Sequence, residues 1–145
     1  HGQTRSTIAA YTALVDRVCP CIVLAHSQGG PFAYAVALAR PDKVKALVLA
    51  EPAGAGDIAQ AAKLKDTPIL SIYGDYIESD SRWPAIRAIN MKFYDAVRAA
   101  GGKPDVVNLP AAGIKGNDHM MMMDRNSDEI AGLINRWLAD KGFYK

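Results

Sequence analysis

The amino-acid sequence predicts an α/β fold, in which a parallel sheet carries helices on both of its faces. Short apolar runs alternate along the chain with longer segments whose apolar residues recur at helical spacing, and this is the pattern of repeated β-α units. The short runs are apolar at successive positions, as expected for parallel strands that are covered on both faces. We expect about four strands and four helices, within a single domain over residues 1–145.

The predicted elements follow one another in a regular order. Residues 6–18 place apolar side chains on one helical face, and Pro20 ends this helix. A strand over 22–25 leads through a tight turn into a helix over 31–40, with Pro31 in its first turn. The later elements are a strand at 44–50, a short helical piece within 53–65, a strand at 68–73, a helix at 85–100, a strand at 105–109, and a helix that begins at Ser127. Right-handed crossovers between parallel strands then put helices on both faces.

Length and composition agree with one globular domain. The chain has 145 residues, of which 50% are hydrophobic and 22% charged, with a net charge of +2. This is enough apolar content for a core, and it gives no electrostatic reason to expect nucleic acid as a partner. No apolar run reaches the length of a membrane span. Neither the oligomeric state nor the location of the protein, whether cytoplasm, periplasm or outside the cell, is predicted from the sequence.

Two cysteines, Cys19 and Cys21, flank Pro20 just before the first predicted strand. They are closer together than the partners of an ordinary structural disulfide, and no set of metal ligands surrounds them. We therefore expect both to be unbridged, small apolar residues at the start of the strand.

The turn after the first predicted strand carries a single hydroxyl group. Residues 25–30 read Ala-His-Ser-Gln-Gly-Gly, so small residues lie two positions before and two positions after Ser27, where a sharp strand-to-helix turn is most crowded. This is the pattern of a nucleophile elbow, usually Gly-x-Ser-x-Gly, with Ala25 in place of the first glycine. Such a turn exposes the Ser27 hydroxyl above the sheet edge. It also places the Gln28 N–H at a helix N-terminus, where it can bind an oxyanion.

Two other interpretations of this turn stay open. In the first, Ser27 is simply the N-cap of the following helix and has no catalytic role. The turn can also bind a dinucleotide, with Glu51 at the next strand end contacting a ribose. That function requires Gly-x-Gly-x-x-Gly, whereas this turn supplies only Gly29 and Gly30.

A serine nucleophile needs a base, and histidine is the base suited to proton transfer near neutral pH. The chain contains three histidines. His1 is terminal, and His26 adjoins Ser27 in a turn that is expected to point the two side chains apart. His119 follows the last predicted strand, at the sheet edge where parallel strands of this kind bind ligands. His119 is therefore the predicted base.

The base in turn needs a carboxylate to orient it. Glu51 ends the strand after the elbow, and Pro52 is expected to hold it in an extended backbone. Asp75, Glu78 and Asp80 follow the third strand and offer the alternative. Chain order and fold alone slightly favour Asp75.

Four segments resemble the α/β-hydrolase superfamily and, more narrowly, a group of bacterial serine esterases that use glutamate as the acid. They are AHSQGG at 25–30, Glu51-Pro52, YGDYIESDSRWP at 73–84 and GNDHMMMMDRN at 116–126. The resemblance implies Ser27 as nucleophile, Glu51 as acid and His119 as base. Asp75 then becomes a structural residue that steadies the loop of His119. The resemblance also implies that residues 1–145 are the C-terminal half of a hydrolase domain, because the complete fold has more strands and a second oxyanion donor.

The expected function is hydrolysis of a small-molecule carboxylic ester through an acyl-enzyme on Ser27, with no cofactor or metal. His26, Met120 and Trp83 are predicted substrate contacts. Of the four methionines at 120–123, we expect two in the core and two beside the base. The same machinery would serve an amidase, a thioesterase or a carbon–carbon hydrolase. A non-catalytic α/β binding module that kept the shape of the turn is the alternative from a different class.

Overall fold

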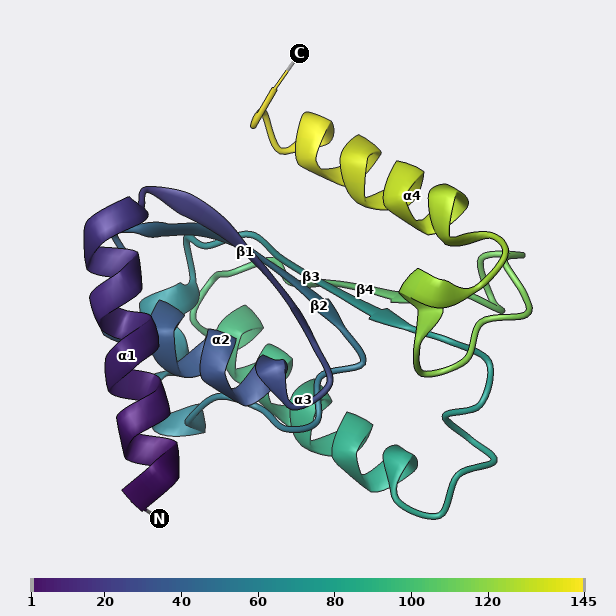
Figure 1. Cartoon of the computed structure of the whole chain (residues 1–145), viewed down its shortest axis with the longest axis horizontal. Coiled ribbons are helices and arrows are strands. Elements are labelled where there is room, and N and C mark those ends of the chain that lie inside the picture. The colour runs from purple at the N-terminus through teal and green to yellow at the C-terminus, as the bar shows by residue number, and fades with distance from the viewer. Residues whose placement is uncertain (1, 145) are drawn as a thin grey trace.

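The computed structural model describes residues 2–144, which contain one sheet of four parallel strands in the order β1-β2-β3-β4 (Figure 1). The strands are β1 (Cys21–His26), β2 (Val44–Ala50), β3 (Ile69–Tyr73) and β4 (Asp105–Asn108). The helices are α1 (Gly2–Val18), α2 (Gly29–Ala39), α3 (Trp83–Ala99) and α4 (Ser127–Asp140), with short 3₁₀ helices η1 (Ile58–Leu64) and η2 (Met121–Met123). The predicted α/β class is confirmed.

Helices cover both faces of the sheet (Figure 1). On β2, Leu47 and Leu49 enter a core shared with α1, α2 and α3, while Val48 and Ala50 enter a second core with η2 and α4. Successive side chains of a strand point to opposite faces, so an unbroken apolar run serves both cores. This explains why the strand at 44–50 could be recognised from its sequence alone.

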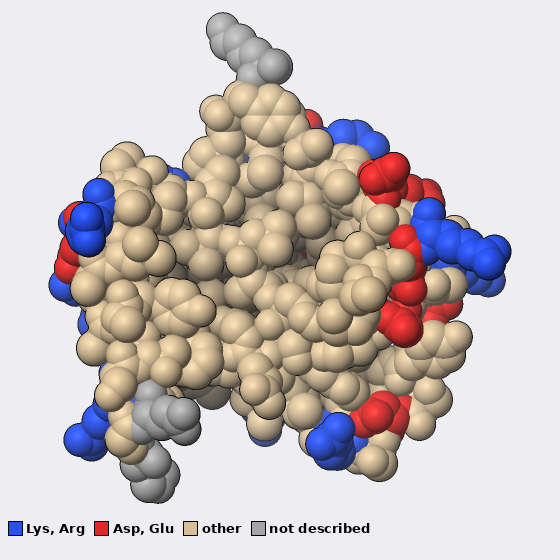
Figure 2. Space-filling model, in the orientation of Figure 1, with Lys and Arg blue, Asp and Glu red and all other residues tan. Residues whose placement is uncertain are grey.

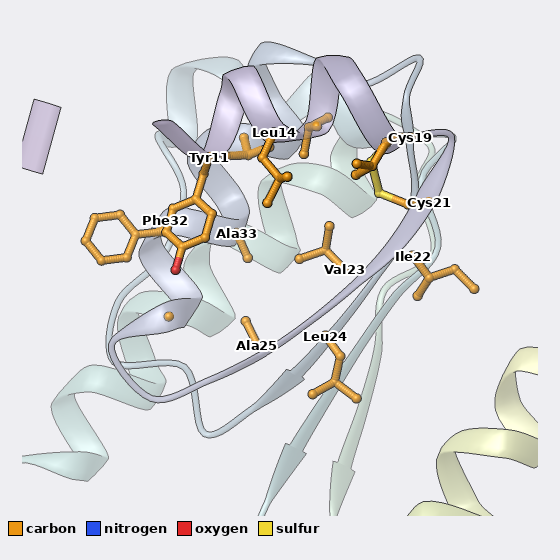
Figure 3. Close-up of a pocket in the computed structure, with 14 residues that line it drawn as sticks. Tyr11, Leu14, Cys19, Cys21, Ile22, Val23, Leu24, Ala25, Phe32 and Ala33 are labelled. Carbon is orange, nitrogen blue, oxygen red and sulfur yellow. A yellow bond between two sulfur atoms is a disulfide. The ribbon is translucent and has the colours of Figure 1, made fainter. Parts of the chain in front are cut away.

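The outer strand β1 is less covered than β2. Its side chains Ile22 and Leu24 are 37% and 62% exposed. An open apolar groove of about 380 Å³ runs along β1 between α1 and α2, with Tyr11, Leu14 and Phe32 among its lining residues (Figure 3). Within residues 2–144, β1 pairs with β2 alone, so this edge of the sheet presents apolar side chains beside unpaired strand backbone.

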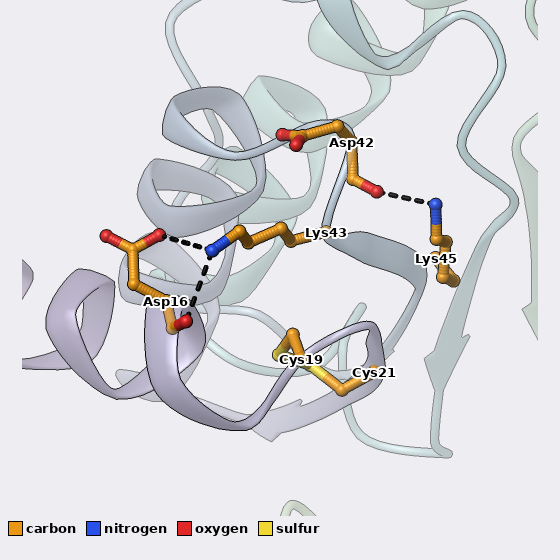
Figure 4. The surroundings of a disulfide bond; sticks show 6 residues. All are labelled: Asp16, Cys19, Cys21, Asp42, Lys43 and Lys45. Atoms are coloured by element: carbon orange, nitrogen blue, oxygen red, sulfur yellow. Dashed lines mark hydrogen bonds and ion pairs between the residues drawn. A yellow bond between two sulfur atoms is a disulfide. The ribbon is translucent and has the colours of Figure 1, made fainter.

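The junction between α1 and β1 contains a disulfide between Cys19 and Cys21, whose Cα atoms are 4.5 Å apart (Figure 4). The expectation that these cysteines are unbridged is wrong. Helix α1 ends at Val18 and β1 begins at Cys21, so the chain changes direction at Pro20 and brings the two side chains together. Sequence separation alone was a poor guide to their distance.

Asp16 ties α1 to the segment after α2. Its carboxylate accepts hydrogen bonds from Arg40 Nε at 2.7 Å and from Lys43 Nζ at 3.1 Å, the second of which is drawn in Figure 4. These bonds, first from Arg40 and then from Lys43, lower the pKa of Asp16 to about 2.

Acidic and basic side chains are mixed around the rim of the face shown in Figure 2, without an extended patch of one sign.

Within residues 2–144, no helix is both long enough and apolar enough to cross a bilayer.

Candidate active site

Ser27 lies in the tight turn between β1 and α2 and has a positive φ of 52°. This conformation is unusual for a residue with a side chain and costs about 1–3 kcal/mol. Three backbone hydrogen bonds hold it. The Ser27 N–H donates to the carbonyl of Ala50 at 3.1 Å, and the Ser27 carbonyl accepts from Gly30 at 3.0 Å and from Ala53 at 2.8 Å. A strained serine at a strand-to-helix turn is the backbone feature of a nucleophile elbow.

The tightest contact of this turn is at Gly30. A Cβ atom at Gly30 would lie 2.5 Å from Cβ and 2.9 Å from Cα of Pro52, whereas one at Gly29 would lie 3.5 Å from Cβ of Ala25. The first separation is a clash and the second an ordinary contact. The sequence argument stressed Ala25 and Gly29, but the structure makes Gly30 the position that must lack a side chain.

His119 joins Ser27 to Glu51 by two hydrogen bonds. Its Nε2 lies 2.8 Å from Oγ of Ser27, and its Nδ1 lies 2.6 Å from Oε2 of Glu51. Glu51 is only 3% exposed, and its second oxygen, Oε1, accepts from the Gly74 N–H at 2.8 Å. A carboxylate accepts hydrogen bonds, so Nδ1 of His119 carries the proton and Nε2 is free to accept the proton of Ser27. The three side chains predicted as nucleophile, acid and base therefore lie in one chain of hydrogen bonds.

The backbone of Glu51 differs from the expectation. Glu51 has a positive φ of 41° rather than an extended conformation before Pro52. Its N–H still donates to the carbonyl of Ile72 at 2.9 Å, so the residue remains bonded to β3 while the chain turns sharply out of the sheet. Two of the three residues in the hydrogen-bonded chain thus occupy the left-handed region that favours glycine.

Asp75, the rival acid, binds the backbone of the loop that carries His119. Its Oδ2 accepts from the Gly116 N–H at 2.9 Å and its Oδ1 from the Asn117 N–H at 3.3 Å, while its own N–H donates to the Asn117 carbonyl at 2.9 Å. Asn117 is itself fully buried and donates to Asp124 and Asn126. In this arrangement Asp75 supports the loop rather than the imidazole.

The other two carboxylates of this segment have different partners. Glu78 pairs with Arg87. Asp80 accepts from the N–H groups of Arg82 and Trp83 at the start of α3, and these bonds lower its pKa.

Gly74 is a close-approach position that the sequence analysis missed. A Cβ atom there would lie 2.6 Å from the carbonyl oxygen of Asn117 and 3.1 Å from Oε1 of Glu51. The absence of a side chain lets β3 end against both the acid and the base loop. A glycine directly after a predicted strand was visible in the sequence, but its neighbours were not.

Two of the predicted substrate contacts lie against the imidazole of His119. The ring centroids of His26 and Trp83 are 4.5 Å and 4.6 Å from that of His119. We expected the side chains of His26 and Ser27 to point apart, but both contact His119. Ser27 contacts the imidazole ring of His119, whereas Nε2 of His26 lies 2.7 Å from the backbone carbonyl oxygen of His119.

The methionines beside the base are more exposed than expected. Met121 is buried, while Met120, Met122 and Met123 are 41%, 45% and 77% exposed. One methionine therefore enters the core instead of the expected two.

Gln28, the predicted oxyanion donor, occupies the N-cap position of α2. Within residues 2–144, no group of three or more His, Cys, Asp and Glu side chains is arranged to hold a metal ion.

A parallel sheet and a serine held in a strained strand-to-helix turn are features that this chain shares with α/β hydrolases. No family model matches the chain. The chain is similar to a solved structure of a novel bacterial esterase, with a TM-score of 0.85 and 35% identity over 92% of this chain and 42% of that one.

Two curated relatives are lipases. The probable secreted lipase phiG of a fungal species is 29% identical over 92% of this chain and 50% of its own length. The lipase LipV of Mycobacterium tuberculosis is 39% identical over 50% of this chain and 28% of its own length. The chain thus resembles lipases and esterases, and it spans half or less of the length of each relative.

Proposed function

We propose that the protein is a serine-dependent carboxylic ester hydrolase. The observation that carries the proposal is the imidazole of His119, which is hydrogen-bonded to the Ser27 hydroxyl at one nitrogen and to the buried Glu51 carboxylate at the other. A serine hydroxyl is a weak nucleophile unless an oriented base removes its proton. The similarity to lipases and to a bacterial esterase supports an ester as the substrate.

The proposed reaction has two halves. Ser27 Oγ attacks the ester carbonyl carbon while His119 Nε2 takes the hydroxyl proton, and the Gln28 N–H stabilises the oxyanion that forms. The intermediate collapses, and His119 returns the proton to the departing alcohol, leaving an acyl group on Ser27. Water then attacks the acyl carbon while His119 Nε2 takes its proton. His119 returns this proton to Ser27 Oγ as the bond between Oγ and the acyl carbon breaks and the acid product leaves. Glu51 holds the imidazole and stabilises its charged form in both halves.

The substrate proposed is a small-molecule ester. The ring of Trp83 lies against the imidazole of His119, and Met120 follows His119 in the sequence. We propose that both side chains contact the acyl or alcohol group of the substrate. The same side chains would also cleave an amide, a thioester or an activated carbon–carbon bond. Turnover of matched substrates distinguishes these reactions.

The proposal concerns the whole natural protein that carries residues 1–145, because the relatives are longer than this chain. That this chain forms the C-terminal half of a hydrolase domain stays a prediction. Reading the coding frame upstream of His1 tests it.

Covalent labelling with a fluorophosphonate tests the function, because Oγ of an activated serine displaces fluoride from phosphorus. We expect one label per chain, mapped to Ser27 by mass spectrometry, together with burst kinetics on an activated ester. Ser27→Ala should lose the label and lower kcat by about 10⁴ or more, with an unchanged melting temperature. Ser79→Ala is the matched control, since Ser79 is exposed and its hydroxyl donates to the Tyr76 carbonyl, outside the hydrogen-bonded chain of Ser27, His119 and Glu51. Labelling of another serine, or turnover that persists in Ser27→Ala, contradicts the assignment. If the folded protein shows neither label nor turnover, the result favours the alternative that it is a non-catalytic α/β binding module.

A further inference from the structure

His26 makes a contact that neither the sequence motif nor the reaction requires. Its Nε2 lies 2.7 Å from the backbone carbonyl oxygen of His119. A carbonyl oxygen only accepts hydrogen bonds, so Nε2 of His26 carries a proton and donates. The bond joins two residues that are 93 positions apart in the sequence.

The two ends of this bond differ in how firmly the fold holds them. His26 is the last residue of β1 and pairs with Ala50 on β2, and the backbone of Ser27 continues directly from it. His119 lies in a loop outside the regular helices and strands, where backbone has no ladder of hydrogen bonds to fix it. The His26 bond therefore attaches the backbone of His119 to the strand that presents Ser27.

The bond also complements the other restraints on His119. Glu51 fixes the Nδ1 side of the ring, and the rings of His26 and Trp83 lie against the imidazole. Asp75 holds the loop two to three residues earlier, at Asn117 and Gly116. Only the His26 bond among these acts on the main chain of His119 itself, so it limits how far the imidazole can shift relative to Ser27.

We propose that His26 is a positioning residue, which donates its Nε2–H to the His119 carbonyl and thereby holds the imidazole within reach of the Ser27 hydroxyl. The proposal rests on the proposed function and assigns His26 a role other than substrate contact. A base displaced by about 1 Å can cost about 10²-fold in rate, whereas substrate affinity does not depend on the proton-transfer distance. Loss of the bond should therefore lower kcat and leave KM nearly unchanged.

Paired variants separate the hydrogen bond from the ring contact. His26→Gln keeps an N–H donor at a similar reach and removes the ring, while His26→Phe keeps a ring and removes the donor. His26→Ala removes both. Lys45→Gln on β2 is the control, since Lys45 is exposed and donates to the Asp42 carbonyl at the other end of the strand from Glu51. All variants are made in the whole natural protein. Steady-state kinetics on an activated ester and amide hydrogen exchange over residues 116–120 are measured for each.

We expect His26→Phe and His26→Ala to lower kcat about 10-fold or more with KM within about threefold of wild type, and to speed exchange at 116–120. His26→Gln should stay within about threefold of wild type in kcat, with unchanged exchange. The proposal is overturned if His26→Gln is as slow as His26→Phe, if KM rises in place of the fall in kcat, or if exchange in His26→Phe is unchanged. Ser27→Ala run in parallel keeps the two proposals apart: its full activity refutes the proposed function, whereas its inactivity beside a fully active His26→Phe refutes only the role of His26.

Discussion

Oε2 of Glu51 lies 2.6 Å from Nδ1 of His119, although the two residues are 68 positions apart in the sequence. Glu51 follows β2, which is central in the sheet, whereas His119 lies in the loop between β4 and α4. The two meet because parallel strands end at one edge of the sheet. Both oxygens of Glu51 are occupied, one by His119 and one by the Gly74 N–H, so the carboxylate has little freedom to rotate.

Replacing Glu51 by Gln should therefore lower kcat by about 10³–10⁴. The amide can donate to Nδ1 and so stabilise the imidazole tautomer that has its proton on Nε2, which is the wrong tautomer to accept a proton from Ser27. Steady-state kinetics and a thermal melt check this prediction.

Asp75→Asn is the matched control, because Asp75 bonds to loop backbone and not to the imidazole. An asparagine keeps one acceptor oxygen, so we expect a loss of about 1–2 kcal/mol in the free energy of unfolding and a modest change in kcat. A large fall in kcat for Asp75→Asn with an unchanged melt would exchange the roles of the two acids.

Local pattern predicted the elements and singled out Ser27 and His119, whereas Glu51 was chosen over Asp75 only through the family resemblance. Buried strands read as apolar runs, and the strand predicted at 44–50 coincides with β2 (Val44–Ala50). Helix ends were less predictable: α1 begins at Gly2 rather than at residue 6, and the helical piece within 53–65 is a 3₁₀ helix over Ile58–Leu64 that Asp57 caps.

Contacts between distant segments could not be predicted. Whether Glu51 or Asp75 reaches His119 depends on the direction in which each chain segment leaves its strand, and the positive φ of Glu51 was not foreseen. The close approaches at Gly30 and Gly74 and the bond from His26 to the His119 carbonyl depend on elements that are far apart in sequence. Local propensity contains no information about such distances.

Gly74→Ala should damage the site although it replaces none of the three side chains in the hydrogen-bonded chain. The new methyl group would lie 2.6 Å from the Asn117 carbonyl oxygen, which is backbone, and 3.1 Å from Oε1 of Glu51. We expect a loss of about 1–3 kcal/mol in stability from overpacking, and a fall in kcat of about 10²-fold as the His119 loop shifts. Chemical denaturation and kinetics measure the two effects.

Gly132→Ala in α4 is the control for this substitution. Its methyl group would approach the end of the flexible Arg136 side chain, at 3.3 Å, so activity should stay at the wild-type level. Alanine should stabilise the helix by up to about 1 kcal/mol. Wild-type kinetics in Gly74→Ala would show that β3 and the loop can separate without moving His119.

The bonds of Asp16 to Arg40 and Lys43 should make the stability of the folded protein fall in acid. Hydrogen bonds from Arg40 and then Lys43 lower the pKa of Asp16 from 3.8 to about 2. Because the pKa is lower in the folded state, the stabilising contribution is fully present above about pH 3.8 and is lost as the pH falls toward 2. The melting temperature of Asp16→Asn should lie below that of wild type at pH 6, by a small amount since the pair is exposed, and the two should converge as the pH approaches 2. A difference that does not change with pH would show that the carboxylate charge contributes nothing.

The exposed edge of β1 should make residues 1–145 self-associate when this segment is produced alone. Leu24 is 62% exposed on β1, beside the apolar groove between α1 and α2, and an apolar strand edge with unpaired backbone is a template for pairing with a second copy. Leu24→Lys places a charge on this edge and should shift the segment toward monomer in size-exclusion chromatography with light scattering. Ile89→Lys is the control, because Ile89 is 51% exposed but belongs to helix α3 and not to an edge strand, and it should leave association unchanged. A monodisperse monomer of the unaltered segment would show that the helices and side chains around β1 already protect its edge.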